Sequence, residues 1–396
     1  MLKARNVLLG ITGGIAAYKA AELTRLLVKD GAKVNVIMTK AGAEFITPLT
    51  MQTLSANPVY SDLFNCVGES KVGHIFLAQR AELIVVAPAT ANCLAKVAAG
   101  ICDDLLTTTI CAASCPIMLC PAMNDRMWDN PIVQGNIKKL KDIGYIVMEP
   151  DSGELACKSV GSGRLPEPAR IVASITRALT PNPLQGLKIL VSAGPTREKI
   201  DLVRFLSNRS SGKMGYALAQ AAYNYGADVT LVSGPTALTP PPGVQFISVE
   251  TAEEMQTALE KHFSSADALI MCAAVADFRP EIISSGKADK KTMPKNLNLV
   301  ENPDILAALS AKKGICLTIG FAAQVGAERE AAERKLEKKG LDFIVYNDVS
   351  ESDIGFDSDD NAVTVIGKDG KAAFFQKMPK TEIARNILEI VFNLKA

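Results

Sequence analysis

One arrangement occurs twice in this chain: an apolar strand that runs directly into a glycine turn. The first copy, VLLGITGG, lies near the N-terminus, and the second, LKILVSAGPT, begins at Leu187. A helical pattern follows the first turn at once and the second turn after a polar insertion over residues 197–213. The free N–H groups at such a helix N-terminus can hold a phosphate. The chain therefore begins a nucleotide-binding fold twice, with a break marked by Pro181 and Pro183 between the copies.

Strands alternate with helices throughout the first half. We expect strands over residues 7–11, 34–38, 83–87, 116–120 and 145–148, with helices between them and a closing helix over residues 167–179. This alternation predicts a doubly wound parallel sheet, whose ligands bind beyond the carboxyl ends of the strands. The first glycine turn and the segments PATAN and PAMN lie at such ends. The glycine spacing departs from G-x-G-x-x-G, so a mononucleotide is a more natural ligand than a dinucleotide. Residues 152–168, rich in glycine, are expected to form a loop or flap.

The second half repeats this logic without close sequence duplication. Strands are expected over residues 187–191, 229–232, 269–274, 316–321 and 343–346, followed by an antiparallel hairpin of residues 362–367 and 372–376 and a helix over residues 381–393. A chain of 396 residues suggests about two or three domains. We predict two doubly wound, mostly parallel-sheet, Rossmann-like α/β domains, residues 1–184 and residues 185–396.

The composition excludes several classes of protein. Net charge is +1, so no global field favours nucleic acid or a membrane surface as a partner. No uninterrupted apolar run is long enough to span a bilayer. Nine cysteines without a C-x-x-C pair are typical of reduced thiols in a cytoplasmic protein, and their spacing is not that of a metal site.

Three residues of the first half could carry chemistry. His74 stands ahead of a helical pattern, where a surface or capping role competes with that of a general base. Asn124 follows a strand, and on pattern alone an Asx turn or helix cap is favoured over binding of a carboxylate. Cys157 lies in a glycine-rich loop near two basic residues, where a reactive thiol and a structural one are equally supported.

Two polar segments of the second half could bind phosphate. The run SNRSSGKMG leads into a helix and is compatible with an anion-binding turn, although it lacks the G-x-x-x-x-G-K-[ST] pattern. Lys287 and Lys290 belong to a lysine-rich segment that follows the strand end carrying Asp277. A solvated face is the ordinary role of such a segment, and binding of a nucleoside triphosphate with a metal ion is the alternative.

Taken together, these motifs resemble a known family. GITGGIAAYK, the His74 segment, APATAN, PAMNDRMWDNP and GELAC…GSGRLPEP match its first half. SAGPTRE, IDLVRFLSNRSSGKMGYALA, AAVADFRP, NPDIL, GFAAQ and IVYNDVS match its second half. The chain is similar over essentially its whole length to the bacterial bifunctional enzymes of coenzyme A biosynthesis that join phosphopantothenoylcysteine decarboxylase to phosphopantothenate–cysteine ligase.

For the first half, the resemblance implies an FMN-dependent decarboxylase. Its substrate would be 4′-phospho-N-pantothenoylcysteine, whose thiol is oxidised to a thioaldehyde so that CO₂ can leave, and its product 4′-phosphopantetheine. On this basis His74 is the base, Asn124 holds the substrate carboxylate and Cys157 supplies a proton. The flavin-binding positions implied are Gly13, Gly14, Ile15, Ala16, Thr39, Ala89, Thr90 and Asn92.

For the second half, the resemblance implies a ligase that uses CTP with Mg²⁺ or Mn²⁺. It would join 4′-phosphopantothenate to cysteine through an acyl-cytidylate, with Asn208 steadying that intermediate and Lys287 serving the activated phosphate. No metal ligand is implied. The nucleotide-binding positions implied are Ala273, Ala274, Asp277, Lys287, Pro303, Asp304, Ile305, Phe321, Lys335 and Lys339. The resemblance also implies a homo-oligomer, with trimer-based packing of the decarboxylase and dimers of the ligase.

Some residues depart from the family pattern and keep alternatives open. Lys158 stands where glycine is expected, Lys199 stands where proline is frequent, and the segment GKADKK leaves Lys287 and Lys290 as competing candidates for the ligase lysine. A ligase with an inactive decarboxylase half is one alternative. A flavin-binding regulatory or interaction protein is another, and the presence of His74, Asn124 and Cys157 together argues against it.

Overall fold

The computed structural model describes residues 2–64, 73–154, 160–283, 296–312, 314–324, 329–348 and 358–394. Contacts divide the chain into two compact units, Met1–Pro181 and Asn182–Ala396. Each unit has its own sheet and its own core, and each is described by itself.

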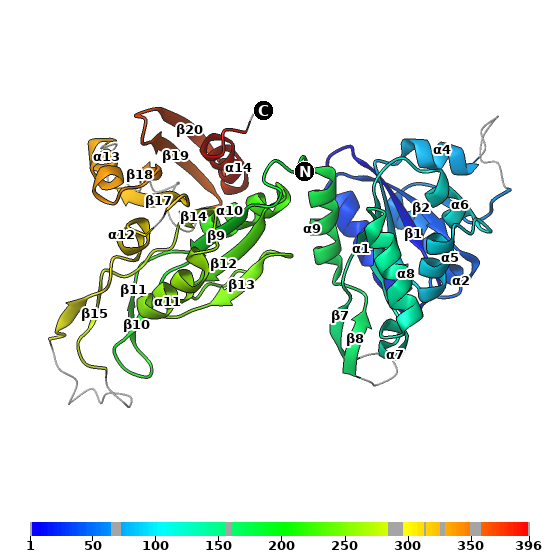
Figure 1. Ribbon diagram of the computed structural model, residues 1–396, viewed down its shortest axis with the longest axis horizontal. Coiled ribbons are helices and arrows are strands. Elements are labelled where there is room, and N and C mark those ends of the chain that lie inside the picture. The colour runs from blue at the N-terminus through cyan, green and yellow to red at the C-terminus, as the bar shows by residue number, and fades with distance from the viewer. Residues whose placement is uncertain are drawn as a thin grey trace. The chain divides into compact units, whose positions relative to one another are not determined.

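The first unit is built on a six-stranded parallel sheet (Figure 1). Its strand order is β3-β2-β1-β4-β5-β6, so the order reverses between β1 and β4. The strands are β1 (Asn6–Ile11), β2 (Lys33–Met38), β3 (Val59–Tyr60), β4 (Leu83–Ala89), β5 (Ile117–Pro121) and β6 (Ile146–Val147). The central strands are almost continuously apolar because both faces of the sheet are covered.

Helices cover both faces of this sheet. They are η1 (Ile15–Tyr18), α1 (Lys19–Lys29), α2 (Lys40–Ala43), α3 (Pro48–Ser55), α4 (Gly73–Arg80), α5 (Ala91–Ala99), α6 (Leu105–Ala112), α7 (Asp125–Trp128), α8 (Pro131–Asp142) and α9 (Pro168–Leu179). Helices α1, α3 and α9 share one core with alternate residues of the strands. Helices α4, α5, α6 and α8 share the other core, which also buries Trp128, the one tryptophan of the chain.

A short antiparallel hairpin stands apart from this sheet, formed by β7 (Asp151–Glu154) and β8 (Val160–Arg164). The sequence predicted a loop or flap in this region, and the structure instead pairs the two ends of the segment as strands. An ion pair between Asp151 and Arg170 ties the hairpin to α9, and the amide of Glu167 donates to Asp151 at 3.0 Å. The hairpin therefore has a fixed base on the closing helix.

The second unit contains an eight-stranded sheet in the order β13-β12-β9-β14-β17-β18-β19-β20. The strands from β13 to β18 are parallel, and β19 and β20 are antiparallel. The sheet strands are β9 (Lys188–Ala193), β12 (Asp228–Ser233), β13 (Gln245–Ser248), β14 (Ala268–Met271), β17 (Leu317–Gln324), β18 (Phe343–Asp348), β19 (Asp360–Gly367) and β20 (Ala372–Pro379). The order reverses between β9 and β14, as it does between β1 and β4.

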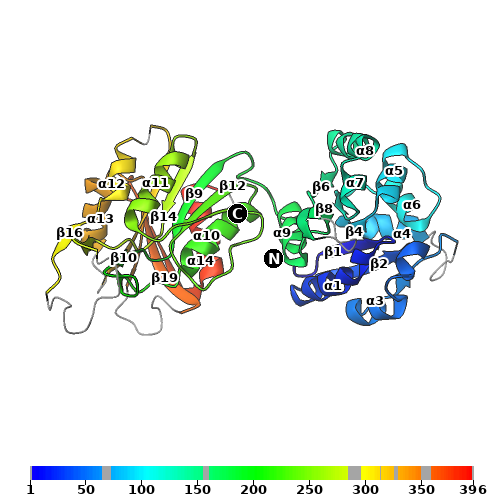
Figure 2. The same cartoon turned by 90° about the horizontal axis from the view of Figure 1, so that it is seen from below.

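Helices again form a layer on each face, as the view from below makes clear (Figure 2). They are α10 (Lys213–Asn224), α11 (Ala252–Phe263), α12 (Ile305–Ser310), α13 (Arg329–Lys338) and α14 (Lys380–Val391). Helices α10 and α14 pack on one face, and α11, α12 and α13 pack on the other. Two short ribbons lie outside the sheet, β10 (Arg197–Lys199) with β11 (Phe205–Ser207), and β15 (Phe278–Pro280) with β16 (Leu299–Glu301).

The predicted fold class is confirmed: two doubly wound α/β units, the second with an antiparallel hairpin. Several local predictions differ from the structure. The helix expected directly after the first glycine turn opens as the 3₁₀ helix η1, and the polar insertion over residues 197–213 contains the β10–β11 ribbon. No described helix is long and apolar enough to cross a membrane. The domain boundary after residue 184 stays a prediction, and in the structure Leu184 packs within the core of the second unit.

Candidate functional sites at the switch point of each sheet

In the first unit, the turns after β1 and β4 are joined by a buried threonine. Thr12, which is 2 % exposed, donates its hydroxyl to the carbonyl of Pro88 at 2.7 Å and accepts from the amide of Thr90 at 3.1 Å. The Thr90 side chain in turn caps α5 by accepting from the amide of Cys93 at 3.3 Å. These bonds fix the two turns at the point where the strand order reverses, which is where doubly wound sheets bind ligands.

The glycine turn also makes a close approach to α2. A Cβ atom placed on Gly13 would lie 2.4 Å from the Cβ of Ala41, so no larger residue fits there. Thr39 begins α2 by accepting from the amide of Gly42 at 3.1 Å. Glycine at this turn is therefore required by packing, and it leaves the adjoining backbone open to a ligand.

A cavity of about 770 Å³ opens at this edge of the sheet. Four of the predicted flavin-binding residues line it, namely Gly13, Thr39, Thr90 and Asn92. Of the other predicted positions, Gly14, Ile15, Ala16 and Ala89 are not among the described residues that line it. The cavity has the size of a pocket for a cofactor, and its open glycine turn and threonine-capped helix starts suit a phosphate-bearing cofactor such as FMN.

The predicted catalytic residues of this unit lie on separate elements. His74 is in the first turn of α4, and its buried Nδ1 atom has no hydrogen-bond partner within the described parts of the chain. Asn124 accepts from the amide of Arg126 at 2.9 Å and so caps α7, while its neighbours Met123 and Met127 line the cavity. Cys157 lies outside the described residues.

One strand of the hairpin, β8, contacts the segment that leads into α7. The amide of Met123 donates to the carbonyl of Gly163 at 2.9 Å, which joins β8 to the residue next to Asn124. A Cβ atom on Gly161 would lie 2.8 Å from the Cβ of Asp125, so β8 lies directly against the start of α7. The structure thus brings strand β8 of the hairpin beside Asn124. Among the described residues, His74 is not one of those that make these contacts with β8.

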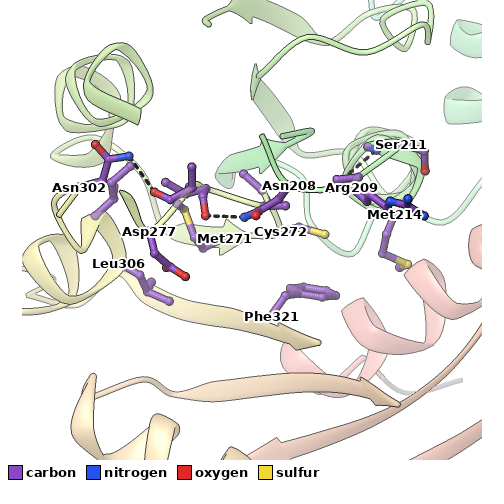
Figure 3. Close-up of a pocket in the computed structure, with 18 of the residues that line it drawn as sticks. Asn208, Arg209, Ser211, Met214, Met271, Cys272, Asp277, Asn302, Leu306 and Phe321 are labelled. Carbon is purple, nitrogen blue, oxygen red and sulfur yellow. Dashed lines mark hydrogen bonds between the residues drawn. The ribbon is translucent and has the colours of Figure 1, made fainter. Parts of the chain in front are cut away.

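The second unit has a cavity of about 760 Å³ at its own switch point. Figure 3 shows lining residues from β14 (Met271), from β17 (Phe321) and from the start of α10 (Met214). The predicted residues that line it are Asn208, Ala273, Ala274, Asp277, Pro303, Asp304, Ile305, Phe321 and Lys339. Lys335, on α13, is not among the described lining residues, and Lys287 and Lys290 lie outside the described part of the chain.

Two asparagines hold the loop that follows β14. The amide nitrogen of the Asn208 side chain donates to the carbonyl of Val275 at 2.9 Å. Asn302 donates from its side chain to the carbonyl of Ala276 at 2.8 Å and accepts from Arg279 at 3.0 Å (Figure 3 shows the first of these two bonds). The loop that carries Asp277 is therefore fastened from two sides.

An ion pair crosses the cavity wall. Lys339 lies 2.9 Å from the carboxylate of Asp304, which also caps α12 by accepting from the amide of Ala307 at 3.1 Å. Burial raises the pKa of Asp304, but the bonds from Lys339 and from that amide outweigh it and leave the pKa below its ordinary value. Asp304 is therefore ionised at neutral pH and presents a charged oxygen at the wall.

Two helix N-termini meet the other end of the cavity. Helix α10 begins after Gly212, whose φ of 76° suits glycine, and its first residue Lys213 lines the cavity. Helix α14 begins at Lys380, which is 6 % exposed, also lines the cavity and donates to the carbonyl of Ser358 at 2.6 Å. Two helix dipoles and two ammonium groups make this end favourable to an anion.

Sequence reasoning missed several lining residues, among them Asn302, Asn347, Asn361 and Lys380. Asn302 could have been found, because it directly precedes Pro303 in a motif that was recognised. Lys380 could not, since nothing in its neighbourhood shows that a terminal helix begins at the cavity. Lys199, one of the departures from the family pattern, pairs with Glu250 at 2.7 Å.

Comparison with known proteins finds relatives of each half of the chain and of the whole. Residues 1–180 match the Flavoprotein family, and residues 184–394 match the C-terminal domain of the DNA/pantothenate metabolism flavoprotein family. The coenzyme A biosynthesis bifunctional protein CoaBC of Vibrio vulnificus (strain CMCP6) is 50 % identical over 376 residues, which cover 94 % of each chain. This chain belongs to the family of CoaBC bifunctional proteins. CoaBC of Bacillus subtilis (strain 168) is 46 % identical over 393 residues, or 98 % of this chain and 97 % of the relative.

A solved structure of the C-terminal domain of a CoaBC protein is also similar. It is 43 % identical, covers 54 % of this chain and 97 % of its own, and has a TM-score of 0.47. The family inferred from the sequence motifs is thus confirmed by the full-length relatives.

Proposed function

We propose that this chain catalyses two consecutive steps of coenzyme A biosynthesis, the ligation of cysteine to 4′-phosphopantothenate and the decarboxylation of the product to 4′-phosphopantetheine. The observation that carries the proposal is a ligand-sized cavity at the switch point of each sheet, in a chain that matches bifunctional relatives over 94 % of its length. We assign residues 1–184 to the decarboxylase and residues 185–396 to the ligase.

In the decarboxylase, FMN would be held by Gly13, Thr39, Thr90 and Asn92, which line the cavity. When bound, FMN supplies the oxidation of the cysteinyl thiol and returns the electrons after CO₂ has left. The turn residues Gly14, Ile15 and Ala16 and the strand end Ala89 would complete the binding segment, and backbone N–H groups at a helix start could bind the phosphate.

The chain's own groups then handle the substrate. His74 accepts a proton from the substrate, a role supported by its buried and unpartnered Nδ1 atom within the described residues. Asn124 binds the substrate carboxylate through its amide, and Cys157 returns a proton in the reductive step. The hairpin is anchored to α9 through Asp151, and its strand β8 contacts Met123, the residue next to Asn124.

In the ligase, the carboxylate of 4′-phosphopantothenate attacks the α-phosphate of CTP and releases pyrophosphate. The amine of cysteine then attacks the acyl carbon and releases CMP. The N-termini of α10 and α14 attract the anionic groups, and Asn208 steadies the acyl intermediate. Lys287 serves the phosphate, and Lys335 and Lys339 complete the nucleotide site.

The divalent cation is expected to enter with the nucleotide. Among the described residues there is no group of three or more His, Cys, Asp or Glu side chains that could hold a metal. Mg²⁺ is commonly bound by substrate phosphates and one or two carboxylates, and Mn²⁺ can replace it. Asp277 and Asp304 both line the cavity and are the predicted nucleotide-binding residues that could supply such a carboxylate. We also propose a homo-oligomer, with trimers through the first unit and dimers through the second.

The decisive experiment supplies the purified protein with 4′-phosphopantothenate, cysteine, CTP and Mg²⁺ and follows the products by mass spectrometry. We expect 4′-phosphopantetheine, CMP and pyrophosphate, and FMN released on denaturation. No phosphopantetheine and no flavin would overturn the proposal. Accumulation of phosphopantothenoylcysteine alone would leave a ligase with an inactive decarboxylase half. A bound flavin without either product would favour a flavin-binding regulatory protein.

A pair of variants isolates the assigned base. His74→Asn should stop the reaction at phosphopantothenoylcysteine, because the ligase cavity belongs to the other unit. Gln79→Asn is the matched control, since Gln79 is an exposed residue of the same helix. Decarboxylation at the wild-type rate in His74→Asn would contradict the assignment. Replacing CTP by ATP in the same assay tests the choice of nucleotide.

A further inference from the structure

Two cysteine side chains are exposed together at the turn between α5 and α6. Cys102 lies in the connection after α5, and Cys111 lies near the end of α6. Neither belongs to the binding or catalytic sets assigned above. The Sγ atom of Cys102 is 3.6 Å from the carbonyl oxygen of Gly100 and 3.8 Å from that of Thr107.

The helix geometry places Cys111 close to the same point. Cys111 is four residues beyond Thr107, so in the α-helix its backbone amide is directed at the Thr107 carbonyl, and the two residues lie on the same face of α6. The Cys102 thiol and the backbone of Cys111 are therefore both next to the Thr107 carbonyl. Desolvation and a direct side-chain interaction with Cys111 raise the pKa of Cys102, which agrees with two thiols in each other's immediate surroundings.

The connection that carries Cys102 is held firmly. Asp104 and Thr107 form a capping box at the start of α6, with the Thr107 amide donating to Asp104 at 2.8 Å. Lys96 pairs with Asp103 at 2.7 Å, and the hydroxyl of Thr108 donates to the Cys102 carbonyl at 3.2 Å. The segment is therefore tied at both ends of the short turn, which fixes the position of Cys102 against α6.

We infer that Cys102 and Cys111 form an oxidisable dithiol site that closes to an intramolecular disulfide under hydrogen peroxide. The thiolate of one cysteine attacks the peroxide, which gives a sulfenic acid and one water. The second thiol then attacks that sulfur, forms the S–S bond and releases a second water. Two thiols and one peroxide thus yield one disulfide and two waters. The reduced pair is equally a two-point ligand for trivalent arsenic.

The other described cysteines explain why this pair should react selectively. Burial raises the pKa of Cys93 and of Cys120 to about 12, so neither thiol ionises readily. Desolvation raises the pKa of the half-buried Cys115 as it raises that of Cys102, so exposure and a neighbouring thiol, and not the pKa, distinguish Cys102 from Cys115. Exposure together with a neighbouring thiol occurs at Cys102 and Cys111 alone among the cysteines that the structure describes.

The site borders the cavity of the first unit. Asp103, Asp104 and Thr107 line that cavity, and they lie between the two cysteines in sequence. A disulfide would therefore close a loop around residues that form part of the cavity wall. This property is independent of the proposed enzymatic function, since it requires neither FMN nor a substrate.

The test is differential alkylation of the whole protein after treatment with hydrogen peroxide. Free thiols are blocked with N-ethylmaleimide, disulfides are reduced, and the released thiols are labelled with iodoacetamide and located by fragmentation mass spectrometry. We expect the second label on Cys102 and Cys111 in equal amounts, together with loss of two hydrogens from the intact mass. The reaction should accelerate from pH 7 to pH 9, because a thiol with a raised pKa gains thiolate as pH rises.

Matched variants decide the pairing. In Cys102→Ser the iodoacetamide label on Cys111 should disappear, and in Cys111→Ser the label on Cys102 should disappear. Cys115→Ser should leave the labelling of both cysteines unchanged. Phenylarsine oxide should protect both cysteines of the wild type from alkylation and protect neither single variant. A second label shared with any other cysteine, a disulfide between chains, or arsenical protection that survives in Cys102→Ser would each overturn the inference.

Discussion

Replacing Asn302 with alanine should impair the ligase without unfolding it. The side chain makes two bonds to the loop that carries Asp277: it donates to Ala276 at 2.8 Å and accepts from Arg279 at 3.0 Å. Each bond is worth about 1 kcal/mol, so their loss weakens the placement of the loop by about 2 kcal/mol. Since 1.4 kcal/mol corresponds to a factor of ten, we expect about a 30-fold loss of kcat/KM for the nucleotide.

The two bonds can be separated by a second substitution. Asn302→Asp keeps an acceptor for Arg279 but places an oxygen where the amide donated to the Ala276 carbonyl, which is on a residue only 6 % exposed. If the bond to Ala276 positions the loop, the Asp variant should lose as much activity as the Ala variant. The assay is pyrophosphate release over a titration of the nucleotide, with thermal unfolding measured beside it.

Asn298→Ala serves as the control, because Asn298 is exposed and directly precedes β16, the strand that Asn302 directly follows. Its kcat/KM should stay within about a factor of two of the wild type, as is usual for exposed positions. Wild-type kinetics in Asn302→Ala, with an unchanged midpoint of unfolding, would refute the assignment of a positioning role to this residue.

Three further results are expected. Thr12→Val removes two buried hydrogen bonds between turns, so urea unfolding of the first unit should show a loss of about 2 kcal/mol and the purified protein should contain less flavin. The pKa of Asp304 is lowered, so its contribution to stability is present above the ordinary pKa of 3.8 and is lost as the pH falls through the lowered pKa. Asp304→Asn removes the carboxylate that pairs with Lys339. In this variant the free energy of unfolding should depend less on pH over that acidic range. Gly212→Ala adds a Cβ atom that would lie 2.7 Å from a neighbouring side chain, so it should raise the KM for the nucleotide and lower stability more than Gly100→Ala, which has a similar φ and open space.

The fold could be predicted from the sequence because its signals are local. The strands of both sheets are apolar runs bounded by glycine or polar turns, and their alternation with helices specifies the layers on each face. The short ribbons could not be predicted this way. The strands β7 and β8 are rich in glycine and polar residues, and their pairing depends on Asp151, whose partner Arg170 lies on another element.

The sites were accessible to sequence reasoning only in part. Thr90, which directly follows β4, and Asp277, in the loop after β14, could be placed at the sheet edge from the pattern. Lys380 reaches the cavity from the last helix of the chain, more than a hundred residues from the strand end that bears Asp277. Such a contact depends on how helices pack over the sheet, which no local pattern encodes.

Each sheet takes all of its strands from one uninterrupted stretch of chain, with the division between Pro181 and Asn182. Among the strands that the structure describes, none is exchanged across that division, so a cut there would open neither hydrogen-bonded ladder. The strand pairing within each unit is therefore independent of the covalent join to the other. One transcript sets equal amounts of the two catalysts, and separate genes could encode the same pair without redesigning either core.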